Sequence, residues 1–304
     1  MREFLAGWLT KCAEENDYLL ITGDLGFGVF DEFRSVHPNR FLNAGVAEQS
    51  MMSLAAALSD FSNRTFVYSI GNFASLRCLE QIRNDICYME KKVTIVSVGS
   101  GFSYGAQGYT HHAIEDIAAT RSLANLDVYS PCDSIELAMV LDSISRSNSP
   151  SLLRLGRGGE VNIHKNSIPE NQNFPIEIAS GTDGVVLFHG PIGVEVLEAI
   201  RKLKTHGFSI TALSCPYLSG EISYFDLLEK FSNKPIIIVE ENSRKGGLAS
   251  SILESLVGAD INLSKFTSLA TNDDLIHSLG SQSFLRKVHG IDSTAIENAF
   301  FNRR

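Results

Sequence analysis

Short runs of apolar residues recur along the chain, and each run is followed by a glycine-containing or polar loop. The runs in the first half cover residues 18–22, 65–70, 92–98, 127–130 and 151–155. Short apolar runs that are bounded by turn residues are typical of strands buried on both faces. The pattern therefore predicts parallel strands at these places.

Segments with helical spacing of apolar residues separate the predicted strands. The expected helices cover residues 3–15, 46–58, 76–89, 114–123 and 134–144. Strands that alternate with helices form a parallel sheet with helices on both faces, and ligands of such sheets bind at the carboxyl ends of the strands. The candidate site is therefore built from the loops that follow these strands, which begin at Gly23, Gly71, Gly99 and Gly156.

The second half repeats this alternation after a polar, irregular stretch at 156–172. Strands are expected at 184–188, 209–213 and 235–239, and helices at 194–206, at 225–230 and within 240–250. We therefore predict an α/β fold with two domains, each a mostly parallel sheet flanked by helices. The expected boundaries are 1–160 for the first domain, 161–180 for a linker and 181–304 for the second domain.

Composition narrows the class of protein. The 304 residues are 44% hydrophobic and 20% charged, so they can bury a core. A net charge of −9 argues against a nucleic-acid partner, since phosphate binding needs a basic face. Five cysteines without a CxxC pair favour free thiols in the cytoplasm. The chain has no run of 18 apolar residues and no long apolar run at its start, so neither a membrane span nor a signal peptide is expected.

Residues 41–58 are expected to form a turn followed by a helix in which one carboxylate adjoins an apolar stripe. Asn43 is expected to cap the helix. The stripe consists of Ala47, Met51, Leu54 and Leu58. Glu48 lies beside it, and a poorly hydrated carboxyl group can exchange a proton near neutral pH, as acid–base catalysis requires. The alternative is a helix-favouring glutamate in the first turn, stabilised by the helix dipole.

The loop at residues 99–112 contains four glycines and ends in two histidines. Glycine lets the backbone approach a ligand closely, and His111 and His112 can donate protons near neutral pH. No further Cys, His or acidic residue has a fitting spacing, so the pair is a weak candidate metal site. The alternative is a structural glycine-rich turn.

Two of these motifs resemble motifs of a known family. The string from Asn43 to Met51, Asn-Ala-Gly-Val-Ala-Glu-Gln-Ser-Met, resembles the glutamate motif of transketolases and deoxyxylulose-phosphate synthases. This resemblance implies that Glu48 contacts the aminopyrimidine ring of thiamine diphosphate and protonates its nitrogen. Residues 105–111, Gly-X-X-Gly-X-Thr-His, are similar to the transketolase loop Gly-Glu-Asp-Gly-Pro-Thr-His. That similarity implies that His111 touches the substrate near the reacting carbon, with His112 as a helper.

The segment 68–85 resembles the family's Ser-Thr-Phe segment and the helix Glu-Gln-Ile-Arg-Asn that follows it. The match implies that Phe73 stacks on the aminopyrimidine and that Ile70 replaces a second aromatic residue. Asp24 matches the aspartate at the end of the family's first strand and is a candidate for holding the pocket. Three further charged residues of this segment are Arg77, Glu80 and Arg83. They could form a surface ion network or line a subunit interface, and the sequence does not distinguish the two.

Some positions expected to contact the substrate match the family's residues, and others differ from them. Arg2 and Arg157 match family arginines that bind the phosphate of the donor, and a guanidinium suits a phosphate. Gln107 stands where transketolases often have Asp, and Gly99 stands where sugar-phosphate transketolases often have His. These departures predict that common pentose phosphates are poor substrates and that a specialised sugar is preferred.

The family's diphosphate-binding domain, with its Gly-Asp-Gly metal motif and downstream Asn, has no counterpart in this sequence. The resemblance therefore implies a small subunit of a split transketolase-like enzyme that transfers a two-carbon ketol unit from a ketose to an aldehyde. A large partner chain is expected to hold the diphosphate and its Mg²⁺ or Ca²⁺ in an α2β2 heterotetramer, with no metal ligand from this chain. The segment 240–250 resembles a family segment that serves mainly in assembly.

Three alternatives stay open. The chain could be a subunit similar to deoxyxylulose-phosphate synthase, or a β-type subunit of a 2-oxo acid dehydrogenase. A non-catalytic α/β assembly subunit is the alternative from a different class, and the presence of both Glu48 and His111 argues against it.

Overall fold

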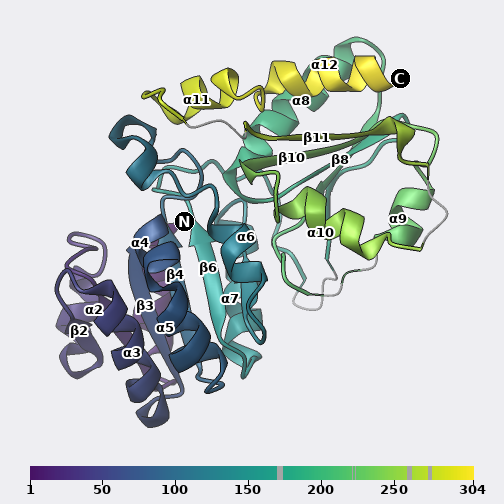
Figure 1. Ribbon diagram of the computed structural model, residues 1–304. Coiled ribbons are helices and arrows are strands. Elements are labelled where there is room, and N and C mark those ends of the chain that lie inside the picture. Colours follow the sequence, from purple (N-terminus) through teal and green to yellow (C-terminus); the bar gives the residue numbers. More distant parts are fainter. Residues whose placement is uncertain (170–173, 221, 223, 259–261, 273–275) are drawn as a thin grey trace.

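The chain forms two sheets in a computed structural model that describes residues 1–169, 174–220, 222, 224–258, 262–272 and 276–304. The first sheet has six strands and the second has five. Figure 1 shows the two sheets with their flanking helices. Both are mostly parallel and flanked by helices, so the predicted fold class is confirmed.

The first sheet has the strand order β2-β1-β3-β4-β6-β5, and every neighbouring pair is parallel. Its strands are β1 (Tyr18–Thr22), β2 (Phe41–Asn43), β3 (Arg64–Ile70), β4 (Val93–Val98), β5 (Asp127–Tyr129) and β6 (Ser151–Leu155). Every residue of the inner strands β4 and β6 is buried, because helices cover both faces of the sheet.

Seven α-helices and several short helical turns belong to this half. They are α1 (Arg2–Cys12), α2 (Asp31–Val36), η1 (Pro38–Arg40), α3 (Glu48–Leu58), η2 (Ser59–Phe61), α4 (Gly71–Ala74), η3 (Leu76–Cys78), α5 (Leu79–Gln81), η4 (Ile82–Cys87), η5 (Gly105–Gln107), η6 (Tyr109–His111), α6 (Asp116–Arg121) and α7 (Ser134–Arg146). Helices α1, α2 and α7 pack on one face of the sheet, and α3, η4 and α6 pack on the other. The helix expected at 76–89 is divided into η3, α5 and the π-helical η4.

Helix α3 departs from the expected stripe and cap. It begins at Glu48, and its N-cap residue Ala47 offers no side-chain hydrogen bond. Asn43 instead accepts hydrogen bonds from the backbone amides of Asp24 and Gly45, so its predicted capping role is wrong. The face of α3 toward the sheet consists of Glu48, Met51, Met52, Ala55 and Ala56. Leu54 is 37% exposed, because the buried face lies one residue to the side of the expected stripe.

The second sheet has the order β11-β10-β8-β9-β7, and only the edge strand β7 is antiparallel to its neighbour. Its strands are β7 (Ile176–Ala179), β8 (Gly184–Phe188), β9 (Ile210–Ser214), β10 (Ile236–Ser243) and β11 (Phe266–Thr271). Its helices are η7 (Gly190–Ile192), α8 (Gly193–Thr205), α9 (Phe225–Glu229), α10 (Leu248–Ser255), η8 (Leu263–Lys265), α11 (Gln282–Val288) and α12 (Ser293–Arg303). Strand β7 lies within the range expected for the linker, and the helix expected within 240–250 begins only at Leu248 because β10 continues to Ser243.

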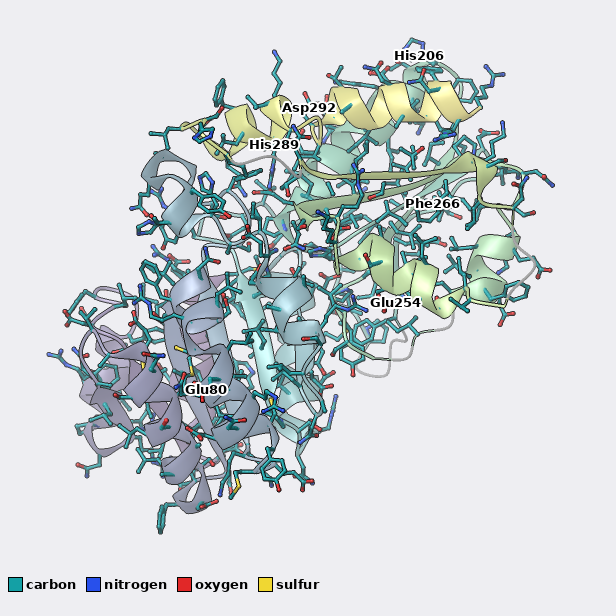
Figure 2. The ribbon with its side chains drawn as sticks, in the orientation of Figure 1. Glu80, His206, Glu254, Phe266, His289 and Asp292 are labelled. Carbon is teal, nitrogen blue, oxygen red and sulfur yellow. The ribbon has the colours of Figure 1, made fainter. Side chains whose placement is uncertain are left out.

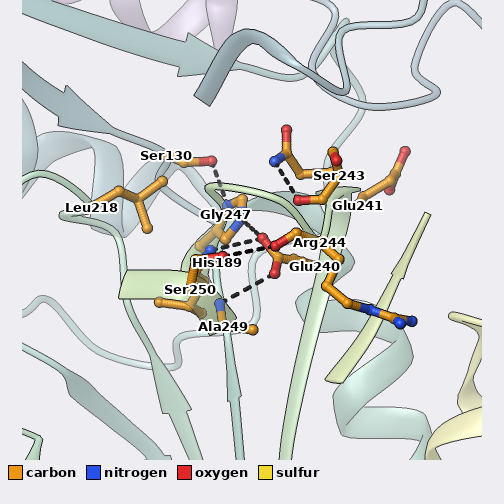
Figure 3. Close-up of polar contacts among 12 residues, drawn as sticks. Ser130, His189, Leu218, Glu240, Glu241, Ser243, Arg244, Gly247, Ala249 and Ser250 are labelled. Carbon is orange, nitrogen blue, oxygen red and sulfur yellow. Dashed lines mark hydrogen bonds and ion pairs between the residues drawn. The ribbon is translucent and has the colours of Figure 1, made fainter. Parts of the chain in front are cut away.

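The two halves are joined by an apolar core and by buried polar contacts. One hydrophobic cluster contains residues of both sheets. His189, at the end of β8, lies between Ser130 of the first half and Glu240 of β10 (Figure 3). Glu254 of α10, labelled in Figure 2, pairs with Arg121 of α6 at 2.8 Å.

The segment that begins at Glu240 docks the second half on the glycine-rich loop. A carboxylate oxygen of Glu241 accepts a 2.6 Å hydrogen bond from the backbone amide of Phe102, and Arg286 pairs with the same carboxylate at 2.6 Å. The amide of Ser243 donates to the carbonyl of Ile114.

The five cysteines are free thiols, and no helix in the described ranges is long and apolar enough to cross a bilayer.

Candidate active site

The carboxyl edge of the first sheet carries Glu48 at the start of α3. Only 4% of Glu48 is exposed, and Arg77 donates a 2.8 Å hydrogen bond to its Oε2. Within the described part of the chain, Oε1 of Glu48 accepts no hydrogen bond. One oxygen of a buried carboxylate is thus held by a cation, and the other is left for a ligand atom.

Arg77 joins Glu48 to two ring side chains. Its guanidinium carbon lies 4.2 Å from the centroid of the Phe73 ring, a distance at which cation–π attraction operates. The ring of His111 meets Phe73 edge to face, with 5.2 Å between the centroids. His111 is half-buried, and its Nδ1 lies 3.0 Å from the hydroxyl of Thr110. The histidine therefore has a fixed ring beside Phe73.

Tyr104 continues this line of side chains to an arginine. Its ring centroid lies 6.4 Å from that of His111, and the guanidinium carbon of Arg157 lies 5.8 Å from the Tyr104 ring. We call this series the site row: Glu48, Arg77, Phe73, His111, Tyr104 and Arg157. It runs from a buried carboxylate at one end to an exposed guanidinium at the other.

Arg2 lies close to the arginine end of the site row. A side chain added at Gly158, which follows Arg157, would approach its Nε to 3.2 Å. Arg2 pairs with Glu3 at 2.9 Å, and this contact raises the pKa of the Arg2 guanidinium. Two cations therefore gather at this end of the site.

Gly99 leaves room for Tyr104. Its φ of +94° is a conformation that favours glycine, and a Cβ at this position would lie 2.2 Å from the Tyr104 ring. No side chain can occupy position 99 while Tyr104 keeps this place. The aromatic ring thus fills space that a residue larger than glycine would need.

A cavity of about 360 Å³ opens beside Arg157, between the two halves of the chain. It is lined by Ser103, Gly105, Ala106, Arg157, Gly158, Gly159, Glu160, Pro191, Gly280, Ser281 and Gln282. An arginine with neighbouring hydroxyl and amide groups is a setting that suits a small anion.

The other residues predicted from the sequence lie around the site row. Asp24 is exposed after β1, and its Oδ1 accepts a 3.1 Å hydrogen bond from the side chain of Asn43, which ties the ends of β1 and β2 together. Ile70 is half-buried at the end of β3, one position before α4. Gln107 is exposed in η5.

His112 has a different environment from His111. It is completely buried, its Nε2 lies 3.3 Å from the carbonyl of Gly105, and its ring meets Phe102 edge to face. Burial lowers the pKa of His112, so its neutral form is favoured. The structure thus separates the two adjacent histidines: His111 lies in the site row, and His112 lies beneath the loop.

Two members of the site row, Arg77 and Tyr104, are not predicted as site residues from the sequence. The sequence leaves Arg77 between two structural roles, and no prediction covers Tyr104. The spacing of Arg77 from Phe73 is one helical turn, which is a usable indication that the two side chains meet. No local pattern indicates that Tyr104 fills the space beside Gly99.

Comparisons with known proteins agree on the family. The profile of the transketolase pyrimidine-binding domain matches residues 1–159. A protein of Methanocaldococcus jannaschii, named as a putative transketolase C-terminal section, is 32% identical over 87% of this chain and 83% of its own length. A protein of Phocaeicola vulgatus, named as one of the subunits of an apulose-4-phosphate transketolase, is 27% identical over 84% of this chain and 82% of its own length.

A solved structure extends the similarity to the whole described fold. It is described as a split-gene transketolase in an inactive β4 tetramer, and it has a TM-score of 0.85 and 26% identity to this chain. The match covers 99% of this chain and 97% of that one. The second sheet is therefore shared along with the first.

Proposed function

The chain belongs to the transketolase family, and we propose that it is the small subunit of a split, thiamine-diphosphate-dependent transketolase. Its reaction would be the transfer of a two-carbon ketol unit from a ketose donor to an aldehyde acceptor. We assign residues 1–160 to the pyrimidine-binding domain, 161–180 to the linker and 181–304 to the transketolase C-terminal domain.

The observation that carries this proposal is the site row. It places a buried carboxylate with one free oxygen, an aromatic ring, a histidine and an arginine along the edge of the sheet where ligands of such folds bind. A flat ring with a basic nitrogen fits the free oxygen of Glu48 and the aromatic surface of Phe73. The residues present therefore fit the pyrimidine part of the proposed cofactor.

Each member of the row has a role in this proposal. The chemistry that a bound thiamine diphosphate supplies is stabilisation of the carbanion formed when the donor's carbon–carbon bond breaks. Glu48 holds and returns the proton of the ring nitrogen, and Arg77 fixes the orientation of its carboxylate. His111 binds the substrate oxygens next to the reacting carbon, Phe73 and Ile70 provide the apolar wall, and Asp24 supports the strand ends.

Arg2 and Arg157 are proposed to bind an anionic group of the donor, such as a phosphate, and Gln107 faces the same substrate. Tyr104 takes the space in which sugar-phosphate transketolases often carry a histidine at the position of Gly99. The donor pocket is therefore narrower and less cationic, which favours a specialised sugar phosphate. A relative named for apulose 4-phosphate supports this direction.

A large partner subunit is proposed to provide the diphosphate site and its Mg²⁺ or Ca²⁺ in an α2β2 heterotetramer. Apolar side chains near the carboxylate end of the row are exposed in this chain: Phe27 by 69%, Leu42 by 40% and Val46 by 75%. Such exposure is typical of surfaces that another chain covers. The relative described as a β4 tetramer and the one named as a transketolase subunit support assembly of this kind. The free thiols support a cytoplasmic location.

The test is reconstitution. This chain is mixed with the candidate large subunit, thiamine diphosphate and Mg²⁺, and ketol transfer is measured with a panel of phosphorylated and unphosphorylated ketoses. The proposal predicts transfer only with both chains present, and poor turnover of xylulose 5-phosphate relative to the preferred donor. No transfer with any donor would refute the activity, while efficient use of xylulose 5-phosphate would refute only the altered specificity.

A further inference from the structure

A buried group of side chains outside the site row lies where the linker passes the amino end of α7. Cys132 precedes the helix, Glu136 lies in its first turn, and His164 comes from the linker. One ligand atom of each residue lies within 4.8 Å of the other two. Cys132 is 2% exposed, Glu136 is fully buried, and the His164 side chain is 7% exposed.

Asp133 fixes the histidine of this group. Its Oδ1 accepts hydrogen bonds from the amides of Ile135 and Glu136 and so caps α7. Its Oδ2 accepts from the backbone amide of His164 at 2.9 Å and contacts the ring Nδ1 at 3.0 Å. The carboxylate therefore uses one ring nitrogen and directs the other, Nε2, away from itself. Histidines that ligate metals are typically oriented by a carboxylate in this way.

Two buried polar atoms of the group lack a partner among the described residues. Nε2 of His164 and Oε1 of Glu136 make no hydrogen bond there, although they lie 4.0 Å apart. The sulfur of Cys132 lies beside the same ring, 3.8 Å from Nδ1, which is the nitrogen that contacts Asp133. Buried polar groups normally have partners, so such a pair indicates a missing one. Around tetrahedral zinc, two ligand atoms are separated by roughly 3.4–3.6 Å, as the zinc–ligand bond lengths require. The three candidate ligand atoms lie within 4.8 Å of one another, so the group has to contract to reach that geometry.

We propose that Cys132, Glu136 and His164 bind a zinc ion. A thiolate, an imidazole and a carboxylate are the ligand types that zinc takes, and the two negative ligands would balance its charge. The Ser214 side chain of β9 lies beside Cys132 and Glu136. A water completes four-coordination, as in zinc sites with three protein ligands.

The position of the group gives the ion a structural role. Since the ligands come from α7 and the linker, and β9 lies beside them, the ion would fasten the second half of the chain to the first.

The test uses the full-length chain, freed of metal with a chelator and then given zinc chloride or cobalt chloride alone. We expect one zinc per chain, a higher melting temperature with zinc, and a cobalt complex with the near-ultraviolet band of a cobalt–thiolate bond. Cys132→Ser should abolish that band, and His164→Ala should weaken zinc binding by more than 100-fold in a chelator competition. Asp133→Asn keeps a capping side chain and should weaken binding about 10–100-fold, as changes to the residue that orients a ligand do.

Cys87→Ser is the matched control, because Cys87 is a buried cysteine outside the group. It should bind zinc and cobalt as the unaltered chain does. The site would be overturned if the unaltered chain bound less than half an equivalent of zinc or if its cobalt spectrum lacked the thiolate band. It would also be overturned if Cys132→Ser and His164→Ala bound zinc as tightly as the unaltered chain. The group would then be an ion pair of His164 with Asp133 and Glu136. The cobalt spectrum of the unaltered chain decides the matter even if a variant fails to fold.

Discussion

At the scale of single residues, several members of the site row could be predicted from the sequence, but the contacts that fix their positions could not. The burial of Glu48 followed from its place among small apolar residues at the start of a helix. Its contact with Arg77 joins residues 29 positions apart and depends on how α3 packs beside the turn of η3, which no local spacing reveals. The place of Tyr104 depends likewise on the backbone conformation at Gly99.

Glu48→Gln should leave the proposed two-chain complex assembled but lower kcat by about 10²–10⁴-fold, because an amide cannot relay the proton of a ring nitrogen. Steady-state kinetics and gel filtration of the complex measure both effects. Glu229→Gln is the control, since Glu229 lies exposed at the end of α9 in the second half and should keep full activity. Turnover of Glu48→Gln within about threefold of the unaltered complex, a margin well below that effect, would rule out the assigned role.

Arg157→Ala should weaken kcat/KM for a phosphorylated donor by about 10–150-fold, because a charge-assisted contact contributes about 1.5–3 kcal/mol. An unphosphorylated donor should be nearly unaffected. Both donors are measured on the unaltered and altered complexes. Arg201→Ala removes an exposed guanidinium of α8 and serves as the control. Equal losses for the two donors would mean that Arg157 has a structural role.

At the scale of elements, strands that are buried on both faces could be predicted from their apolar runs, and so could the edge strand β5, whereas the edge strands β2, β7 and β11 could not. The edge strand β11 exposes part of four of its six residues, so its sequence Phe-Thr-Ser-Leu-Ala-Thr lacks a clear apolar run. Strand β2 has only three residues, and α12 has little separation of polar and apolar faces. Tertiary pairing, and not local pattern, determines such segments.

The buried His189 at the end of β8 should make stability depend on pH. Burial lowers its pKa against the opposing effect of Glu240, and Arg154 lowers it further. The unfolded chain therefore takes up a proton at higher pH than the folded chain. The free energy of unfolding should fall as pH decreases through about 6.5, the ordinary histidine value, until the lowered pKa is passed. Urea unfolding between pH 7.5 and 5 measures this.

His189→Gln should lose some stability at pH 7.5, but its free energy of unfolding should decline less toward pH 5 than that of the unaltered chain. The two slopes should differ by at most about 1.4 kcal/mol per pH unit, the contribution of one proton. His112 and His289, whose pKa values burial also lowers, should maintain the remaining dependence. His206→Gln removes an exposed histidine and should leave the decline unchanged. An undiminished decline in His189→Gln would show that His189 does not contribute to it.

At the scale of the whole molecule, the two sheets share one hydrophobic cluster, and polar contacts of Glu240 and Glu241 fix them further. The site row runs along the carboxyl edge of the first sheet and ends beside the cavity between the halves. The sequence predicted two α/β units and the edge that carries the site. It could not predict the cavity, because side chains from both halves form it. We propose that this chain supplies the pyrimidine end of a cofactor site that another chain completes.

Calorimetric titration of thiamine diphosphate with Mg²⁺, into this chain alone and into its complex with the large subunit, tests that claim most directly. We expect weak or undetectable binding to the isolated chain, because the diphosphate and metal contacts are proposed to belong to the partner. Binding to the complex should be tight and should depend on Mg²⁺. Tight binding of thiamine diphosphate to the isolated chain would contradict it.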